Sequence, residues 1–144
     1  MPTDIQFFLE VRHHDWFGKA DTSKELFETL HSLNMGAVIT DTAGRRDAAH
    51  MRLTIPKAFI RYVGNSLHPT DYTRIDVWIN RMKYWLDHGL QELYFFMHMH
   101  DEATSPELTV YLVNKMNAVC GLNLMKPTFL DTSLLPKAMQ SKLF

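Results

Sequence analysis

The chain has 144 residues, of which 46% are hydrophobic and 22% charged, with fifteen Lys and Arg residues against sixteen Asp and Glu residues. This composition predicts one globular domain, and the small net charge gives no field that would attract nucleic acid or an anionic membrane. No apolar run approaches the ~20 residues of a membrane helix, and the N-terminus lacks the pattern of a signal peptide. Because Cys120 is the single cysteine, no internal disulfide can form, and we expect a cytoplasmic protein.

The first predicted element is a strand from Ile5 to Arg12. Apolar residues at positions 5, 7, 9 and 11 share one face, which we expect to pack against helices. Glu10 and Arg12 fall on the opposite face. A helix is predicted from Asp21, and Gly36 is a candidate for its left-handed C-terminal cap.

The rest of the chain continues to alternate between strands and helices. Three strands are predicted next, of which the middle one is minor: Ala37 to Asp41, Met51 to Ile55, and Lys57 to Val63. A helix from Asp71 to Gly89, a strand from Glu92 to Met99 and a helix from Ser105 to Gly121 follow. Residues 122–144 are weakly patterned and are expected to pack on the domain or to be partly disordered.

With the minor strand left out, the order β-α-β-β-α-β-α predicts a parallel sheet with right-handed crossovers. The strands are apolar on the helix side and mixed on the other. A barrel interior accommodates that pattern better than an open doubly wound sheet, whose strands are apolar on both faces. The predicted fold is therefore α/β, with the parallel sheet of a (β/α) barrel over residues 1–121.

The segment Phe8–Phe17, FLEVRHHDWF, is similar to the F-x-E-x-R-H-x-x-W strand of the YecE-like family, a domain of unknown function. The likeness continues at residues 37–45, 58–64 and 78–96, and spans roughly residues 6–120. The family resembles a TIM-like barrel of about 250 residues. The resemblance implies that residues 1–121 form a parallel (β/α) half-barrel, the C-terminal half of such a barrel. Val63 and His98 depart from the family pattern, both at strand ends.

In parallel barrels, sites form at the carboxyl ends of strands. Those ends here carry Glu10, Arg12, Asp41, Arg61 and His98. Glu10 and Arg12 could form a substrate clamp, or a structural ion pair that fills the barrel. Asp41 could be a general base, a metal ligand or a cap for the following turn. Arg61 needs a partner, for which Glu10, Asp41 or a ligand anion would serve.

Histidines also gather at strand ends, in the pair His98 and His100 and in the pair His13 and His14. Together with carboxylates they could form a divalent metal site. The spacing follows no zinc signature, however, so neither a metal nor another cofactor is predicted.

The C-terminal sequence resembles the Q-x-x-L-F peptide by which bacterial proteins dock on the replication sliding clamp. Gln140 would bind at a pocket rim, and Leu143 and Phe144 would fill an apolar pocket. The alternative is a terminal segment whose Leu and Phe pack on this domain.

Two functions remain open at this point, and the sequence does not decide whether the protein is an enzyme. The first is a barrel that binds a small anionic or sugar-like ligand, with hydrolase or isomerase-type chemistry in the full-length form. The second is a non-catalytic interaction module that docks through its tail. A half-barrel would also leave two strand edges and an apolar interior open. We therefore expect association with a second copy or with the missing N-terminal half.

Overall fold

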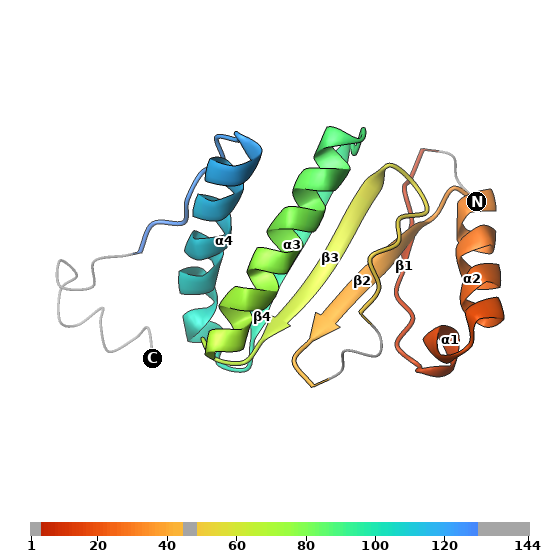
Figure 1. The fold of residues 1–144 in the computed structure, drawn as a ribbon, viewed down its shortest axis with the longest axis horizontal. Helices are drawn as coiled ribbons and strands as arrows, with labels where there is room; N and C mark the ends of the chain where they lie inside the picture. Colours follow the sequence, from red (N-terminus) through yellow and green to blue (C-terminus); the bar gives the residue numbers. More distant parts are fainter. Residues whose placement is uncertain (1–3, 45–48, 130–144) are drawn as a thin grey trace.

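The structure is a computed structural model that describes residues 4–44 and 49–129 (Figure 1). Its strands are β1 (Phe8–Leu9), β2 (Gly36–Thr42), β3 (Lys57–Gly64) and β4 (Glu92–Met99). Its helices are α1 (Asp15–Gly18), α2 (Ala20–Ser32), α3 (Pro69–Asp87), the 3-10 turn η2 (Glu102–Thr104) and α4 (Ser105–Cys120). None of the described helices is long and apolar enough to cross a membrane.

The four strands form one parallel sheet in the order β1-β2-β3-β4. Alternate residues of β2 show that the helices cover a single face. Ala37 packs in a cluster with residues of α2, and Asp41, four residues on, bonds to residues of α3. Thr40 precedes Asp41 and faces the other side of β2, where its side chain bonds to Glu10. Helices on one face are expected of a barrel segment, whereas a doubly wound sheet carries them on both. The predicted α/β half-barrel is confirmed.

The main core lies between the helix face of the sheet and α3 and α4. β3 alternates strictly between fully buried residues on the helix face and half-buried residues on the other. Trp78 and Trp85, seven residues apart on α3, are both buried. The most deeply buried apolar residues are Ile39, Ala58, Ile60, Tyr62, Ile75, Trp78, Ile79, Met82 and Leu108.

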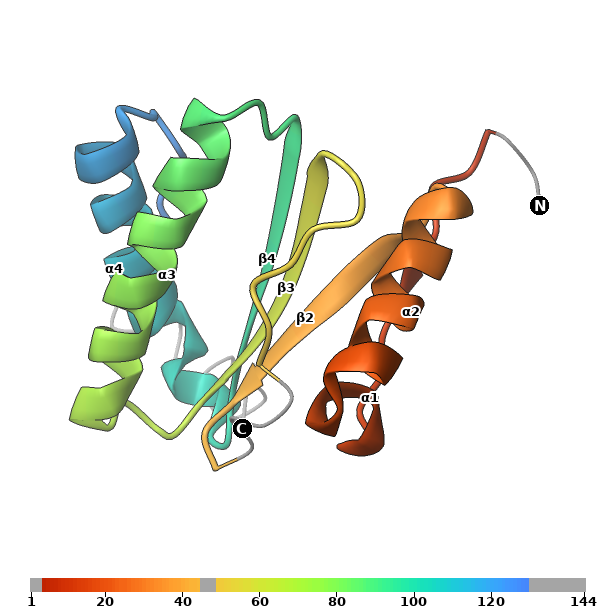
Figure 2. The same ribbon diagram turned by 45° about the vertical axis from the view of Figure 1, so that its right-hand side comes forward.

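The connection from β2 to β3 contains no helix among its described residues. Residues 51–55, predicted as a minor strand, pair with no strand and instead cover the outside of β2. Thr54 fixes this path, because its hydroxyl donates to the Met35 carbonyl at 2.6 Å and accepts from the Ala37 amide at 3.1 Å. In Figure 2 the yellow segment before β3 runs between α2 and α3, where a barrel would otherwise place a helix.

Two predictions about the N-terminal region were wrong in detail. Only Phe8 and Leu9 of the predicted strand pair with β2. Gly36 is not the helix cap; it begins β2, while Asn34 takes the left-handed conformation at φ 52°. Gly36 has a different role, since a Cβ there would lie 2.2 Å from the ring of Phe8. Phe8 packs on Phe59 with ring centroids 5.3 Å apart, so the missing side chain lets β1 dock on the sheet.

We expect Gly36→Ala to destabilise the protein by about 1–3 kcal/mol, because the added methyl must displace the Phe8 ring from its packed position. Gly18→Ala is the matched control, since a Cβ at Gly18 meets nothing within 4 Å. Urea unfolding followed by circular dichroism measures both. Equal free energies of unfolding for the two variants would contradict the close approach.

His50 is half-buried beside α1 and α2, with ring centroids 5.5 Å from Phe17 and 4.9 Å from Phe27. Burial lowers the pKa of His50 to about 4, and the nearby charge of Arg52 acts in the same direction. The folded protein therefore favours the neutral imidazole. The unfolded chain binds the proton more readily, so this stabilisation is present above pH 6.5 and is lost as the pH falls towards 4.

We expect the free energy of unfolding to fall by about 2 kcal/mol between about pH 7 and pH 5 on account of His50. His50→Gln should remove this part of the pH dependence, whereas His88→Gln, at an exposed histidine, should leave it. Urea unfolding at the two pH values makes the comparison. The prediction fails if His50→Gln and wild type lose stability in parallel.

Candidate functional site

The face of the sheet opposite the helices is lined by aromatic rings. Phe8 lies 6.2 Å from Tyr94, and Phe59 lies 6.1 Å from Tyr94 and 4.7 Å from Phe96, measured between ring centroids. We call these four residues the aromatic floor. Tyr94 and Phe96 are 42% and 45% exposed, so no described element covers this part of the floor. A sheet face this apolar and this open is a surface on which ligands or other chains pack.

A polar cluster lies beside the floor, towards the carboxyl ends of the strands. The register of β2, β3 and β4 sets Thr40, Arg61 and Phe96 side by side. Glu10 follows β1 and accepts a hydrogen bond from the Thr40 hydroxyl at 2.6 Å. The Arg61 guanidinium lies 3.4 Å from the same carboxylate oxygen, Oε1. Three separate segments therefore converge on one carboxylate.

Arg12 completes this cluster from the same side of the chain. Its Nε donates to Glu10 Oε1 at 3.0 Å and its terminal nitrogen donates to Oε2 at 3.1 Å. This two-pronged contact confirms that Glu10 and Arg12 share a face, as the alternation predicted. The Arg12 side chain is 62% exposed and the Glu10 side chain only 25%. Arg12 therefore caps the carboxylate from the solvent side.

The pKa of Glu10 lies below its ordinary value. Partial burial raises it, but hydrogen bonds from Arg12 and Thr40 and the charges of Arg12 and Arg61 together outweigh that effect. Glu10 is therefore ionised at neutral pH and acts as a hydrogen-bond acceptor. A general acid needs a raised pKa, so this environment does not prepare Glu10 to donate a proton.

Arg61 is the cation of the cluster with hydrogen-bonding capacity to spare. A guanidinium has five N–H donors in a planar fork. Among the residues that the structure describes, the one acceptor given to Arg61 is Glu10, at a long 3.4 Å. Its side chain is 32% exposed and stands between Thr40 and Phe96 in the register. The Arg61 guanidinium can therefore donate to an anion from its present position on β3.

His98 lies two residues beyond Phe96 on the same face of β4, level with Val63. Its Nδ1 is 3.3 Å from Glu102, which also accepts from the Ser105 hydroxyl at 2.7 Å. Those two hydrogen bonds lower the pKa of Glu102. His98 thus belongs to the rim of the open face, in contact with the turn that leads into α4, and makes no contact with Glu10 among the described residues.

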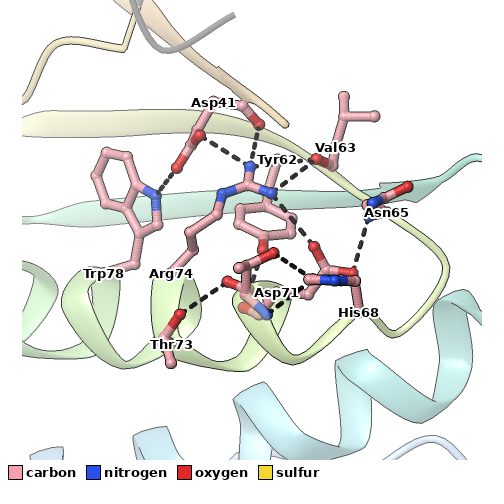
Figure 3. Close-up of polar contacts among 10 residues, drawn as sticks. Asp41, Tyr62, Val63, Asn65, His68, Asp71, Thr73, Arg74 and Trp78 are labelled. Atoms are coloured by element: carbon pink, nitrogen blue, oxygen red, sulfur yellow. Dashed lines mark hydrogen bonds and ion pairs between the residues drawn. The ribbon is translucent and has the colours of Figure 1, made fainter. Parts of the chain in front are cut away.

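Asp41 does not line this face, and the prediction that it would do so was wrong. It follows Thr40 and therefore points to the opposite side of β2, where it is 1% exposed. Arg74 donates to its Oδ1 at 2.8 Å, and the Trp78 indole donates to its Oδ2 at 2.7 Å (Figure 3). β2 is buried on both faces over most of its length, so its composition gave no parity signal to separate the two directions.

Asp41 belongs instead to a buried network around Arg74, which the sequence patterns did not reveal (Figure 3). Arg74 also contacts Asp71 at 3.3 Å and the Val63 carbonyl at 3.2 Å, and its guanidinium lies 4.3 Å from the centre of the Tyr62 ring. Two buried carboxylates thus share one guanidinium. The network joins β2, β3 and the first turns of α3.

Arg74→Met should cost about 3–5 kcal/mol of stability, because it leaves the Asp41 and Asp71 carboxylates buried without their cation. Lys83→Ala is the control: the Lys83–Asp87 pair is exposed and one helical turn apart, so its loss should have little effect on stability. Chemical denaturation gives both values. Similar losses in the two variants would show that the network is not a structural anchor.

The histidine cluster differs from the one that the sequence suggested. Among the described residues, the group with metal-ligating atoms close together is His13, His14 and Asp15. All three are exposed, and both imidazoles already contact the Asp15 carboxylate, at 3.3 and 2.9 Å. Asp41 cannot join them, because it faces the helices. A site that combines these histidines with Asp41 is therefore not assembled among the described residues.

The tail residues Gln140, Leu143 and Phe144 lie outside the described residues. The described part of the extension, residues 122–129, has no regular secondary structure. It begins by packing on α4, where the Asn117 side chain accepts from the Leu124 amide at 2.7 Å and donates to its carbonyl at 3.1 Å. Docking through the tail stays a prediction.

Comparison with known proteins agrees with this arrangement. A family model described as "Protein of unknown function DUF72" matches residues 1–128. The chain belongs to the DUF72 family. A curated relative, the UPF0759 protein YecE of Escherichia coli strain K12, is 29% identical over 126 residues. The protein of the same name from Escherichia coli O157:H7 matches equally well.

A DUF72 family protein of known structure shares the fold. The crystal structure of EF0366 from Enterococcus faecalis V583 matches with a TM-score of 0.66 over 90% of this chain, at 14% identity. The match covers 53% of that chain, and the YecE matches cover 75% of this chain and 46% of YecE. The chain therefore spans about half the length of its DUF72 relatives.

Proposed function

We propose that the open face of the sheet binds a small ligand that joins an anionic group to a sugar-like body. The observation that carries this proposal is Arg61, a half-exposed guanidinium on a rigid strand, flanked by the aromatic floor. A guanidinium suits a phosphate or carboxylate, because two of its N–H groups can donate to two oxygens of the same anion. Aromatic rings suit the apolar face of a sugar ring, as in many ligand sites.

Glu10 supports the same proposal in a different way. Its carboxylate holds Arg61 beside Thr40 and accepts from Arg12, so the cluster is organised before a ligand arrives. The carboxylate of Glu10 has further lone pairs that can accept a hydrogen bond from a hydroxyl of the ligand. Because the pKa of Glu10 is lowered, we propose binding as the function of these residues, in preference to hydrolase chemistry that would need a protonated acid.

Ribose 5-phosphate is a suitable probe, with ribose and inorganic phosphate as its two halves. In a titration followed by NMR of the full chain, we expect ribose 5-phosphate to shift the Arg61 side-chain signal and the amides of Thr40 and Phe96. Arg61→Ala should weaken this binding at least tenfold, since it removes the anion's donors. Arg61→Lys should recover only part of it, because an ammonium lacks the planar fork.

Arg81→Ala is the matched control, because it removes an arginine from α3, on the helix side of the sheet. It should leave the titration unchanged. Saturable binding that survives Arg61→Ala would move the site elsewhere. Shifts from ribose alone, equal to those from ribose 5-phosphate, would refute an anion site and leave only sugar stacking on the floor.

A further inference from the structure

The outer edge of β4 is unusually open for the edge of a sheet. β4 is eight residues long, Glu92–Met99, and has no strand beyond it among residues 4–44 and 49–129. Exposed edges are normally protected by lysine, proline, bulges or short length. Between Glu92 and His98 this strand carries only apolar and aromatic residues. Its backbone is therefore a template on which another parallel strand can pair.

Apolar surface flanks this edge on both faces of the sheet. On the open face stand Tyr94 and Phe96, each more than two-fifths exposed. On the helix face an apolar groove of about 280 Å³ lies between β4, α3, α4 and the start of the extension. Its lining includes Leu93, Phe95 and Met116. A strand added at β4 would thus cover apolar side chains in both directions.

The opposite end of the same sheet offers the complementary element. β1 is the other edge strand, and its helix-side residue Leu9 is 39% exposed. Ile5, just before β1, is 56% exposed. Paired beside β4 of another molecule, these two side chains would face the apolar groove. Phe8 and Glu10, on the open face, would lie beside Tyr94 and Phe96.

We propose that two copies of this chain close into an eight-stranded ring, with β1 of each copy parallel to β4 of the other. Two four-stranded sheets related by a two-fold axis remove both edges at once, and a two-fold dimer is the commonest closed assembly. Length supports a second copy as the occupant. The chain spans about half the length of its DUF72 relatives. The remaining half of such a relative is therefore about as long as this chain, and a second copy has the size needed to take its place.

This assembly also completes the proposed binding site, and in that respect the inference deepens the proposed function. Closure brings β4 of the second copy, with its rim residue His98, beside Glu10 and Arg12 of the first. Each polar cluster then has a wall on both sides, as a ligand site requires. The dimer itself does not depend on any ligand, so it can be tested alone.

Sedimentation and light scattering of the full chain at micromolar concentration test the dimer. We expect twice the 16.8 kDa of one chain. Phe96→Glu and Leu9→Glu place a charge at β4 and at β1, and each should weaken association at least tenfold. Tyr84→Glu is the matched control, because Tyr84 is a 53% exposed aromatic residue of α3, away from both edges. It should leave the mass unchanged, and circular dichroism checks that every variant is folded.

Three results would overturn the proposal. A folded monomer across the micromolar range would show that the edges stay open, or that another chain fills them. A mass that grows without limit would mean that β1 and β4 pair without closing a ring. A dimer lost in Phe96→Glu but kept in Leu9→Glu would indicate that β4 pairs with β4 of the other copy and not with β1. The sedimentation and light-scattering experiments contain no ligand. A negative result there would refute the dimer, and ligand binding at Arg61 would still be tested separately by the NMR titration.

Discussion

The ion pairs of Arg74 with two buried aspartates are the interaction on which the rest of this structure depends. Asp41 comes from the end of β2, and Asp71 and Arg74 come from the first turns of α3. The guanidinium also bonds to the backbone of β3 through Val63. Charges buried this deeply are tolerated only with good geometry and several hydrogen bonds. Here they fix the carboxyl ends of two strands against one helix.

Two parts of the network extend this fixing to the loop after β3. The Asn65 amide donates to Asp71 at 2.8 Å, and the Tyr62 hydroxyl donates to the Asp71 carbonyl at 3.0 Å. Arg74 Nε is the one buried side-chain polar atom without a partner among the described residues. With β2 and β3 held in this way, Thr40 and Arg61 keep the register that brings both to Glu10. The open face is therefore ordered by contacts made on the opposite one.

The sequence allowed the parallel sheet and most element boundaries to be predicted, because alternation and caps are local signals. β4 and α4 were predicted to within a residue, and Glu10 and Arg12 were placed together on the open side although β1 ends at Leu9. Asp41 was misplaced because β2 is apolar on both sides, which removes the signal that parity reasoning needs. Arg74 was missed for another reason: Asp41 is 33 residues away in the sequence, and the i,i+3 spacing to Asp71 does not distinguish a buried pair from an ordinary pair on the helix surface.

Thr40 and Asp41 are neighbours in the sequence and face opposite sides of the same strand. In β2 a single residue step thus separates two sets of contacts: Asp41 bonds to α3, and Thr40 bonds to Glu10 on the open face. Selection or engineering can then vary residues on the open face, such as Thr40 and Arg61, while the anchoring residues remain in place. A scaffold so divided can change the side chains of its open face without losing the contacts that hold its strands to its helices.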